Sequence, residues 1–215
     1  MKKNHTEIAV VLDKSGSMGS CVNDTIGGFN QFLKDQKEVQ GTANFTLMQF
    51  DTNYHIIHDG IDIQNAKFLD NKNYNPSGMT ALHDAVGRTI NSIGQRLDKM
   101  PDHEKPEHVI IVIITDGEEN SSVEFQKDNI ASMIKHQQEK YNWKFTFLGA
   151  DIDAWDIARS LNIDSNVTMK FAKNKKGISD AYCSVSSNMA QMRSGAKADM
   201  SYSQEDYDKQ KDAGV

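Results

Sequence analysis

Cysteine and proline are scarce in this sequence of 215 residues, which contains two cysteines and three prolines. Two cysteines cannot build the disulfide framework of a small secreted domain, and Cys21 and Cys183 are too far apart for a CxxC metal-binding pair. We therefore expect two free thiols in a reducing compartment, with a single long-range disulfide as the alternative. The low proline and glycine content also excludes a collagen-like chain.

The sequence also lacks an excess of positive charge. Its 30 acidic residues outnumber its 24 basic ones, and the formal net charge is −6 at pH 7. The densest basic group, formed by Lys173, Lys175 and Lys176, is short enough to be a solvated turn. A protein that binds nucleic acid usually carries a larger basic patch, so we expect no nucleic acid among its partners. The acidic balance is compatible with binding a hard cation.

Long apolar runs are absent as well. Two N-terminal lysines precede an apolar run of only five residues, Ile8–Leu12, and an aspartate follows it. This run is too short for the apolar core of a signal peptide, and nothing approaches the ~20 apolar residues of a transmembrane helix. We therefore expect a cytoplasmic protein that does not bind a membrane.

What the sequence does contain is an alternation of short apolar runs and amphipathic segments. Continuous β-branched runs are typical of buried parallel strands, and apolar residues at every third or fourth position indicate helices. We predict strands at Ile8–Leu12, Phe45–Phe50, Tyr54–Ile63, Val109–Ile114, Trp143–Leu148 and Val167–Phe171. We predict helices within Val22–Leu33, Leu82–Leu97, Phe125–Lys140, Ala154–Leu161 and Ser179–Met192.

This order of elements predicts an α/β fold, a doubly wound, mostly parallel six-stranded sheet with helices on both faces. Tyr54–Ile63 follows the preceding strand after only Asp51–Asn53, so a hairpin makes it an antiparallel strand at the sheet edge. Thr80 is placed to cap the helix that follows it. We assign residues 1–193 to one domain, and residues 194–215, which have almost no core-forming side chains, to a polar, flexible tail.

Small polar and acidic side chains stand next to three of these elements. Asp13, Ser15 and Ser17 follow the first strand, Asp116 follows the most hydrophobic strand, and Thr80 precedes a helix. Ligands of a doubly wound sheet bind at the carboxyl ends of its strands. Two carboxylates and three hydroxyls would form a shell of hard oxygen ligands. Such a shell suits Mg²⁺, Mn²⁺ or Ca²⁺ and does not suit zinc, which prefers cysteine and histidine.

These residues resemble the metal-ion-dependent adhesion site (MIDAS) of the von Willebrand factor type A (VWA) family. That site is written D-x-S-x-S, then a distant threonine, then a distant aspartate after a hydrophobic strand. The matching residues here, in the same order, are Asp13, Ser15, Ser17, Thr80 and Asp116. The resemblance covers about residues 6–193 and implies a Rossmann-like fold.

The resemblance also implies roles for the matching residues. Ser15 and Ser17 would ligate the metal directly, Asp13 and Asp116 would act directly or through water, and Thr80 would join or leave the shell when a ligand binds. An aspartate or glutamate of a partner protein would complete the shell. The implied function is that of an adaptor, a cation-dependent protein-binding domain that is not an enzyme and has no small-molecule substrate.

Residues beside the motif carry weaker expectations. Lys14 lies between Asp13 and Ser15, and we expect it to point to solvent. Glu118 and Glu119 extend the acidic rim, either as solvated loop residues near a helix N-terminus or as a second cation site or partner-selecting rim.

Two other functions remain for comparison. A Mg²⁺-dependent enzyme of the haloacid dehalogenase type would need a second aspartate two positions after Asp13, where Ser15 stands, and no phosphate-binding glycine motif occurs. A structural or assembly subunit, in which the metal only stabilises the loops, would have the same motif. Removing the metal would then lower stability without changing partner binding.

Overall fold

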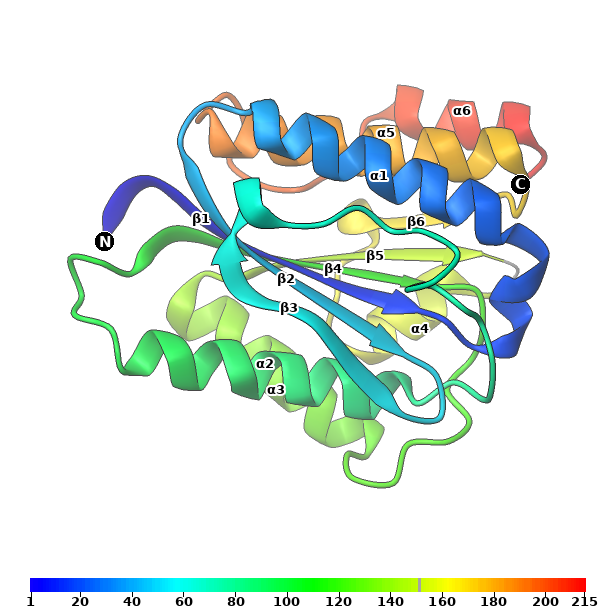
Figure 1. Ribbon diagram of the computed structural model, residues 1–215, viewed down its shortest axis with the longest axis horizontal. Coiled ribbons are helices and arrows are strands. Elements are labelled where there is room, and N and C mark those ends of the chain that lie inside the picture. The colour runs from blue at the N-terminus through cyan, green and yellow to red at the C-terminus, as the bar shows by residue number, and fades with distance from the viewer. Residues whose placement is uncertain (151) are drawn as a thin grey trace.

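The computed structural model describes residues 1–150 and 152–215. Within these residues, six strands form one sheet in the order β3-β2-β1-β4-β5-β6 (Figure 1). The strands are β1 (Lys2–Asp13), β2 (Thr42–Phe50), β3 (Tyr54–Asp62), β4 (Pro106–Thr115), β5 (Lys144–Ala150) and β6 (Thr168–Phe171). Neighbouring strands are parallel, except that β3 pairs antiparallel with β2 at one edge. The predicted α/β sheet with one antiparallel edge strand is confirmed.

Helices cover both faces of the sheet (Figure 1). They are α1 (Val22–Glu38), α2 (Leu82–Asp98), α3 (Lys127–Tyr141), α4 (Ala154–Ser160), α5 (Lys175–Arg193) and α6 (Gln204–Ala213). Alternate residues of β1 point to opposite faces, so Ile8, Val10 and Leu12 join the core under α1 and α5. Ala9 and Val11 join the second core, under α2, α3 and α4.

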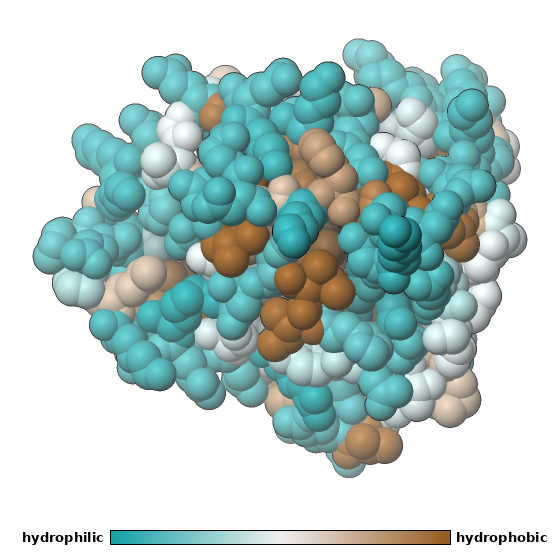
Figure 2. Space-filling model, in the orientation of Figure 1, coloured by the Kyte–Doolittle hydropathy of each residue, from teal (hydrophilic) through white to brown (hydrophobic). Residues whose placement is uncertain are grey.

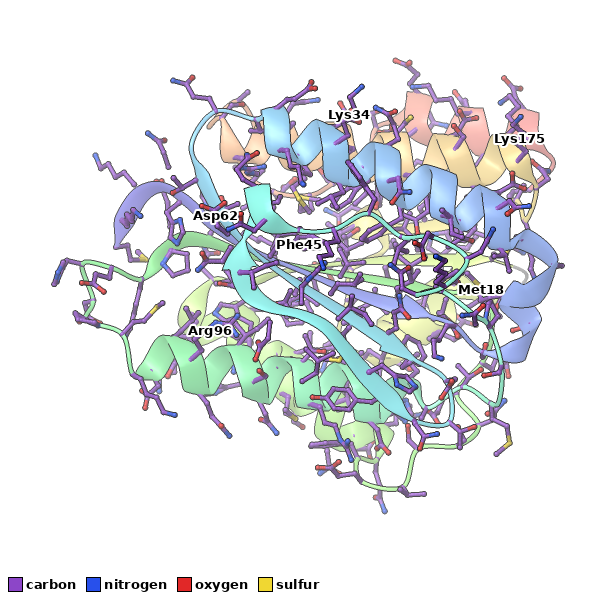
Figure 3. The ribbon with its side chains drawn as sticks, in the orientation of Figure 1. Met18, Lys34, Phe45, Asp62, Arg96 and Lys175 are labelled. Atoms are coloured by element: carbon purple, nitrogen blue, oxygen red, sulfur yellow. The ribbon has the colours of Figure 1, made fainter. Side chains whose placement is uncertain are left out.

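The point at which the strand order reverses lies between β1 and β4. From β1 the chain proceeds outward to β2 and β3, and then returns to form β4 on the other side of β1. The carboxyl ends of these parallel strands therefore meet at one edge of the sheet, toward the right of Figure 1. Met18, in the loop after β1, lies at this edge (Figure 3). A doubly wound sheet places its ligand site at such a reversal.

The C-terminal segment corrects one prediction. We predicted that residues 194–215 form a flexible tail, but the structure folds them against the domain and forms α6 within them. Met200 and Tyr202 are buried, and the Tyr202 hydroxyl lies 2.8 Å from Oγ1 of Thr146 on β5. A capping box between Ser203 and Asp206 begins the helix. A few anchoring side chains and a good cap were enough to order a segment of polar composition.

The surface seen in Figure 2 is mainly hydrophilic, with a group of hydrophobic atoms near its middle. Large exposed apolar side chains include Ile56 on β3 and Phe68 in the segment after it, and the Lys37 ammonium lies over the Phe68 ring. In the part of the chain that the structure describes, no helix combines the length and the apolar character needed to span a bilayer.

Candidate metal centre

Three loops meet at the carboxyl edge of β1 and β4. The first follows β1 and contains a short 3₁₀ turn, Gly16–Cys21, in place of the extended loop that the alternation at 13, 15 and 17 would give. Main-chain hydrogen bonds join it to the loop before α2, from Gly16 N to Gly78 O at 3.1 Å and from Ser77 N to Lys14 O at 2.8 Å. The loop before α2 is bonded in turn to the loop after β4.

Asp13 ends β1 and is fully buried. Each of its carboxylate oxygens accepts a hydrogen bond: Oδ1 from the main-chain N–H of Ser15 at 2.6 Å, and Oδ2 from Oγ1 of Thr115 at 2.5 Å. Burial raises the pKa of Asp13 to about 6, against the opposing effect of these hydrogen bonds. The carboxylate is thus held in place by neutral donors, and a cation placed beside it would relieve the cost of its burial.

Ser15, Ser17 and Asp116 bring three side-chain oxygens together. The two serine hydroxyl oxygens are 3.1 Å apart, and the Ser17 hydroxyl donates to Oδ1 of Asp116 at 2.6 Å. Adjacent oxygens in an octahedral Mg²⁺ shell, with bonds of about 2.1 Å, are about 3 Å apart. The separation of the two serine oxygens is close to this value, and the Ser17–Asp116 separation is the shorter one of a hydrogen bond.

Thr80 reaches the same place from the loop before α2. A Cβ built on Gly117 would lie 3.0 Å from the Thr80 Oγ1 and 3.7 Å from the Ser17 Oγ, so both hydroxyls border the space that a side chain at position 117 would enter. The Thr80 main chain is fixed by Asn120, whose Oδ1 accepts from Thr80 N at 2.9 Å. The structure therefore brings all five predicted residues to one edge of the sheet, and a side chain at position 117 would crowd Thr80.

The donor set fits a hard cation and not a soft one. Among the described residues there is no group of three or more histidine, cysteine or acidic side chains that could hold a metal. The oxygens that converge here come instead from hydroxyls and carboxylates, as Mg²⁺, Mn²⁺ and Ca²⁺ require.

Lys173 also reaches this site, from the loop between β6 and α5. Its Nζ lies 2.5 Å from Oδ2 of Asp116 and donates to the main-chain oxygen of Ser17 at 2.9 Å. The ammonium and the carboxylate form an ion pair. The prediction that Lys173 belongs to a solvated turn is wrong. The position of Lys173 near this site could have been predicted from the topology, because Lys173 follows a strand whose carboxyl end lies at the same edge of the sheet.

Lys14 departs from expectation in a similar way. It does not point to solvent, because its Nζ forms an ion pair with Oδ2 of Asp51 at 3.0 Å and the side chain is largely buried. Asp51 follows β2, so this pair ties the first loop to the β2–β3 hairpin. Nearby, Gly78 has a φ of +72°, and a Cβ there would lie 2.7 Å from Oγ1 of Thr52, so this turn requires glycine.

The start of α2 is held by Glu119 and not by Thr80. The N-cap of α2 is Ala81, which makes no side-chain capping bond, and the predicted Thr80 cap is therefore wrong. A carboxylate oxygen of Glu119 accepts from the main-chain N–H of His83 at 2.8 Å. The other oxygen accepts from the main-chain N–H groups of Ser121 and Ser122. Glu119 thus lies at a helix N-terminus, but the helix is α2, which precedes it, and the side chain is largely buried. The prediction of a solvated loop residue near the next helix is therefore wrong for Glu119.

Comparison with known proteins agrees with this geometry. A family model described as the von Willebrand factor type A domain matches residues 7–194. The chain belongs to the VWA domain family. No curated protein sequence matches it.

Solved structures share the fold of this VWA domain at low sequence identity. The vWF domain of the type V pili tip protein Mfa5 from Porphyromonas gingivalis is 11% identical, with a TM-score of 0.60 over 89% of this chain and 95% of that one. Proximal thread matrix protein 1 from the mussel byssus, with a zinc-occupied MIDAS motif, is 14% identical, with a TM-score of 0.60 over 88% of this chain and 47% of that one. Manganese-loaded TRAP protein of Plasmodium vivax is 12% identical, with a TM-score of 0.55 over 81% and 71%.

Several of these structures are larger than the present chain. It spans 63% of the PilB minor pilin of Streptococcus sanguinis and about half of the mussel protein. At these identities the likeness establishes the fold alone.

Proposed function

We propose that this VWA domain binds a partner protein through a divalent cation held at the carboxyl edge of its sheet. The ligands would be Asp13, Ser15, Ser17, Thr80 and Asp116, the cation Mg²⁺ (or Mn²⁺ or Ca²⁺), and the partner would supply an aspartate or glutamate. The observation that carries the proposal is the convergence of the Ser15, Ser17 and Asp116 oxygens at separations of 3.1 and 2.6 Å.

The residues divide the work according to their contacts. The Ser15 and Ser17 hydroxyls and the Asp116 carboxylate would face the cation. Both oxygens of Asp13 also accept hydrogen bonds, from Ser15 N and from Thr115, so Asp13 fixes the loop and would join the shell of the cation directly or through water. A bound cation would act as a hard Lewis acid toward an incoming carboxylate. With few protein charges around it, the cation keeps part of its positive charge for the partner.

The family supports binding as the class of function. VWA domains commonly mediate protein interactions, and structures that share this fold include a pilus tip protein and a minor pilin. Two others are described with zinc in a MIDAS motif or loaded with manganese. We infer the same kind of site here, and no enzymatic activity, nucleic acid or small-molecule substrate forms part of the proposal.

Calorimetry on chelator-treated protein tests the site. We expect wild type to bind Mg²⁺ and Mn²⁺, with acetate added to stand in for the partner carboxylate, and Asp116→Asn to lose this binding. Ser17→Ala removes a hydroxyl that touches Asp116, whereas Ser20→Ala changes an exposed serine of the same turn. Ser20→Ala should bind like wild type.

A second step separates binding from structural support. If neither wild type nor any variant binds metal, even with excess acetate, the proposed metal site is wrong. A second outcome is that metal binds and raises stability, but a pull-down recovers the same proteins in Mg²⁺ and in chelator. The domain is then a structural subunit in which the metal only stabilises the loops. Recovery of an interacting protein in Mg²⁺ only, and not with Asp116→Asn, supports the proposed function.

A further inference from the structure

The candidate centre already contains one positive charge supplied by the chain itself. The side chain of Asp116 is 1% exposed and that of Lys173 is 15% exposed, and their charged atoms lie 2.5 Å apart. The same ammonium donates to the main-chain oxygen of Ser17, whose hydroxyl donates to the other oxygen of Asp116. Lys173 thus contacts two of the residues that would surround the metal.

This contact has an electrostatic reason. A carboxylate buried to this degree is costly unless a cation neutralises it. In the structure, the Lys173 ammonium supplies that cation. A metal at Oδ1 of Asp116, beside Ser17, and the ammonium at Oδ2 would lie on the two oxygens of one carboxylate, where two cations repel each other at short range. Neutralisation by lysine and by a metal are therefore alternatives.

We propose that Lys173 is a tethered competitor of the metal: its ammonium neutralises Asp116 in the metal-free protein and must swing away when a divalent cation binds. This inference rests on the proposed metal site. It assigns Lys173 the role of lowering cation affinity, which requires no change of fold.

The chain on both sides of Lys173 is anchored, which limits the movement to the side chain. Before it, Ala172 N donates to Oε1 of Gln210 at 3.1 Å, and after it, Nδ2 of Asn174 donates to the main-chain oxygen of Ala213 at 2.8 Å. Both partners belong to α6, which lies beyond residues 7–194 matched by the family model. The C-terminal helix therefore fixes the base of a long flexible side chain whose end reaches Asp116.

The competition has a measurable size. If the lysine-bound state is the main population, the apparent metal affinity is reduced by the fraction of molecules in which the site is open. A site that is open in about 1–10% of molecules would bind metal about 10- to 100-fold more weakly than the same site without the lysine.

Mg²⁺ and Mn²⁺ calorimetry with Lys173→Met, in excess acetate, tests the inference. We expect the metal Kd to fall about tenfold or more relative to wild type. Lys175→Met, which removes an equal charge from an exposed position two residues away (Figure 3), should change it by less than about twofold, as long-range screening requires. Lys173→Gln, which keeps a hydrogen-bond donor without the charge, should also bind metal more tightly and guards against misfolding of the methionine variant.

Thermal unfolding gives a readout that does not depend on partner binding. In chelator, Lys173→Met should unfold at a lower temperature than wild type because Asp116 is left without a counter-ion, and saturating Mg²⁺ should remove most of the difference. Equal metal affinity in the Lys173 and Lys175 variants would overturn the competition while leaving the metal site standing. Absence of metal binding in every variant, Lys173→Met included, would overturn both proposals.

Discussion

Thr115, the last residue of β4, donates from its hydroxyl to Oδ2 of Asp13, the last residue of β1, at 2.5 Å. The same hydroxyl oxygen accepts a hydrogen bond from the main-chain N–H of Gly117 at 3.2 Å. One threonine therefore connects the ends of the two central strands and orders the loop that carries Asp116. The side chain is not among the proposed ligands, yet it holds one of them in place.

Replacing Thr115 by valine should separate this positioning role from metal ligation. Thr115→Val keeps the shape of the side chain and leaves the buried Oδ2 of Asp13 without a donor, which typically costs about 1–3 kcal/mol of unfolding free energy. We also expect weaker metal binding, because Asp13 loses its orientation. Urea unfolding in chelator and calorimetry measure the two effects.

Thr89→Val is the matched control, because Thr89 is equally buried but donates within α2, to Ala85 O. It should lower stability without changing metal affinity. If the two variants behave alike toward metal, Thr115 has no part in the site.

Gly117→Ala should add a methyl group beside Thr80 and Ser17 at the candidate centre. The new methyl group would lie 3.0 Å from the Thr80 hydroxyl, closer than an ordinary contact, and Thr80 would have to move. We expect metal affinity to fall about tenfold or more, the effect of losing about 1.4 kcal/mol of binding energy. Gly19→Ala is the control, because a Cβ at Gly19 meets no atom within 4 Å. If the metal affinity of Gly117→Ala equals that of wild type, Thr80 is not a ligand of the metal.

The sequence predicted those features that depend on a short stretch of neighbouring residues. Short apolar runs became the strands of the sheet, and because Asp13 and Asp116 stand directly after two of them, parallel pairing of β1 with β4 brought them to the same edge. Ser15 and Ser17 came with Asp13, since they belong to the same loop. The chemistry of the five side chains could therefore be stated before their positions were known.

The features that were missed depend on contacts between distant parts of the chain. Lys173 pairs with Asp116 across 57 positions of sequence, Glu119 caps a helix that begins before it, and Lys14 finds Asp51 on another strand. The composition of the C-terminal segment did not predict α6, because only a few side chains near the helix, such as Tyr202, are buried in the core. Local propensity does not predict these pairings, because they form only when the sheet and its helices have packed together.

Arg96 and Glu7 form an ion pair far from the candidate centre, with Nη2 of Arg96 2.6 Å from Oε1 of Glu7 (Figure 3 shows Arg96 on α2). The Glu7 side chain is 0% exposed, and Arg96 also pairs with Asp59 of β3 at 2.6 Å. Burial raises the pKa of Glu7, against the lowering effects of Arg96 and of hydrogen bonds from Asn44 and Thr46. Arg96→Met would leave a buried carboxylate unpaired, at a cost of about 3–5 kcal/mol near neutral pH.

The same variant should acquire a pH dependence of known sign. A carboxyl group whose folded pKa is raised above its ordinary 4.5 contributes stability that is fully present below that value and is lost as the pH rises through the folded pKa. Removing Arg96 raises the folded pKa further. Arg96→Met should therefore lose more stability than wild type as the pH rises above about 4.5. Adding Glu7→Gln should abolish the difference in slope. A pH-independent penalty would show that Glu7 is not the group responsible.

Gln210 connects α6 to the loop that carries Lys173, and its replacement tests whether the C-terminal helix influences the metal site. Its side chain accepts from Ala172 N at 3.1 Å and donates to Gly177 O at 3.0 Å, and both bonds are buried. Gln210→Ala should lower the unfolding free energy by about 1–3 kcal/mol, because it leaves buried main-chain groups without partners. It should also free the base of Lys173 and so strengthen metal binding, since the ammonium would compete less effectively.

A double-mutant cycle distinguishes this route from a general loosening of the domain. In the Lys173→Met background the competing charge is gone, so Gln210→Ala should no longer change the metal Kd. Gln204 lies at the exposed start of α6, where its side chain donates to Oδ1 of Asp208. Gln204→Ala should leave the affinity unchanged in both backgrounds. If Gln210→Ala strengthens binding equally with and without Lys173, the helix acts on the site by another path. A dependence on Lys173 would mean that α6, although it lies outside the residues matched to the family, helps to set the affinity of the family's metal site in this chain.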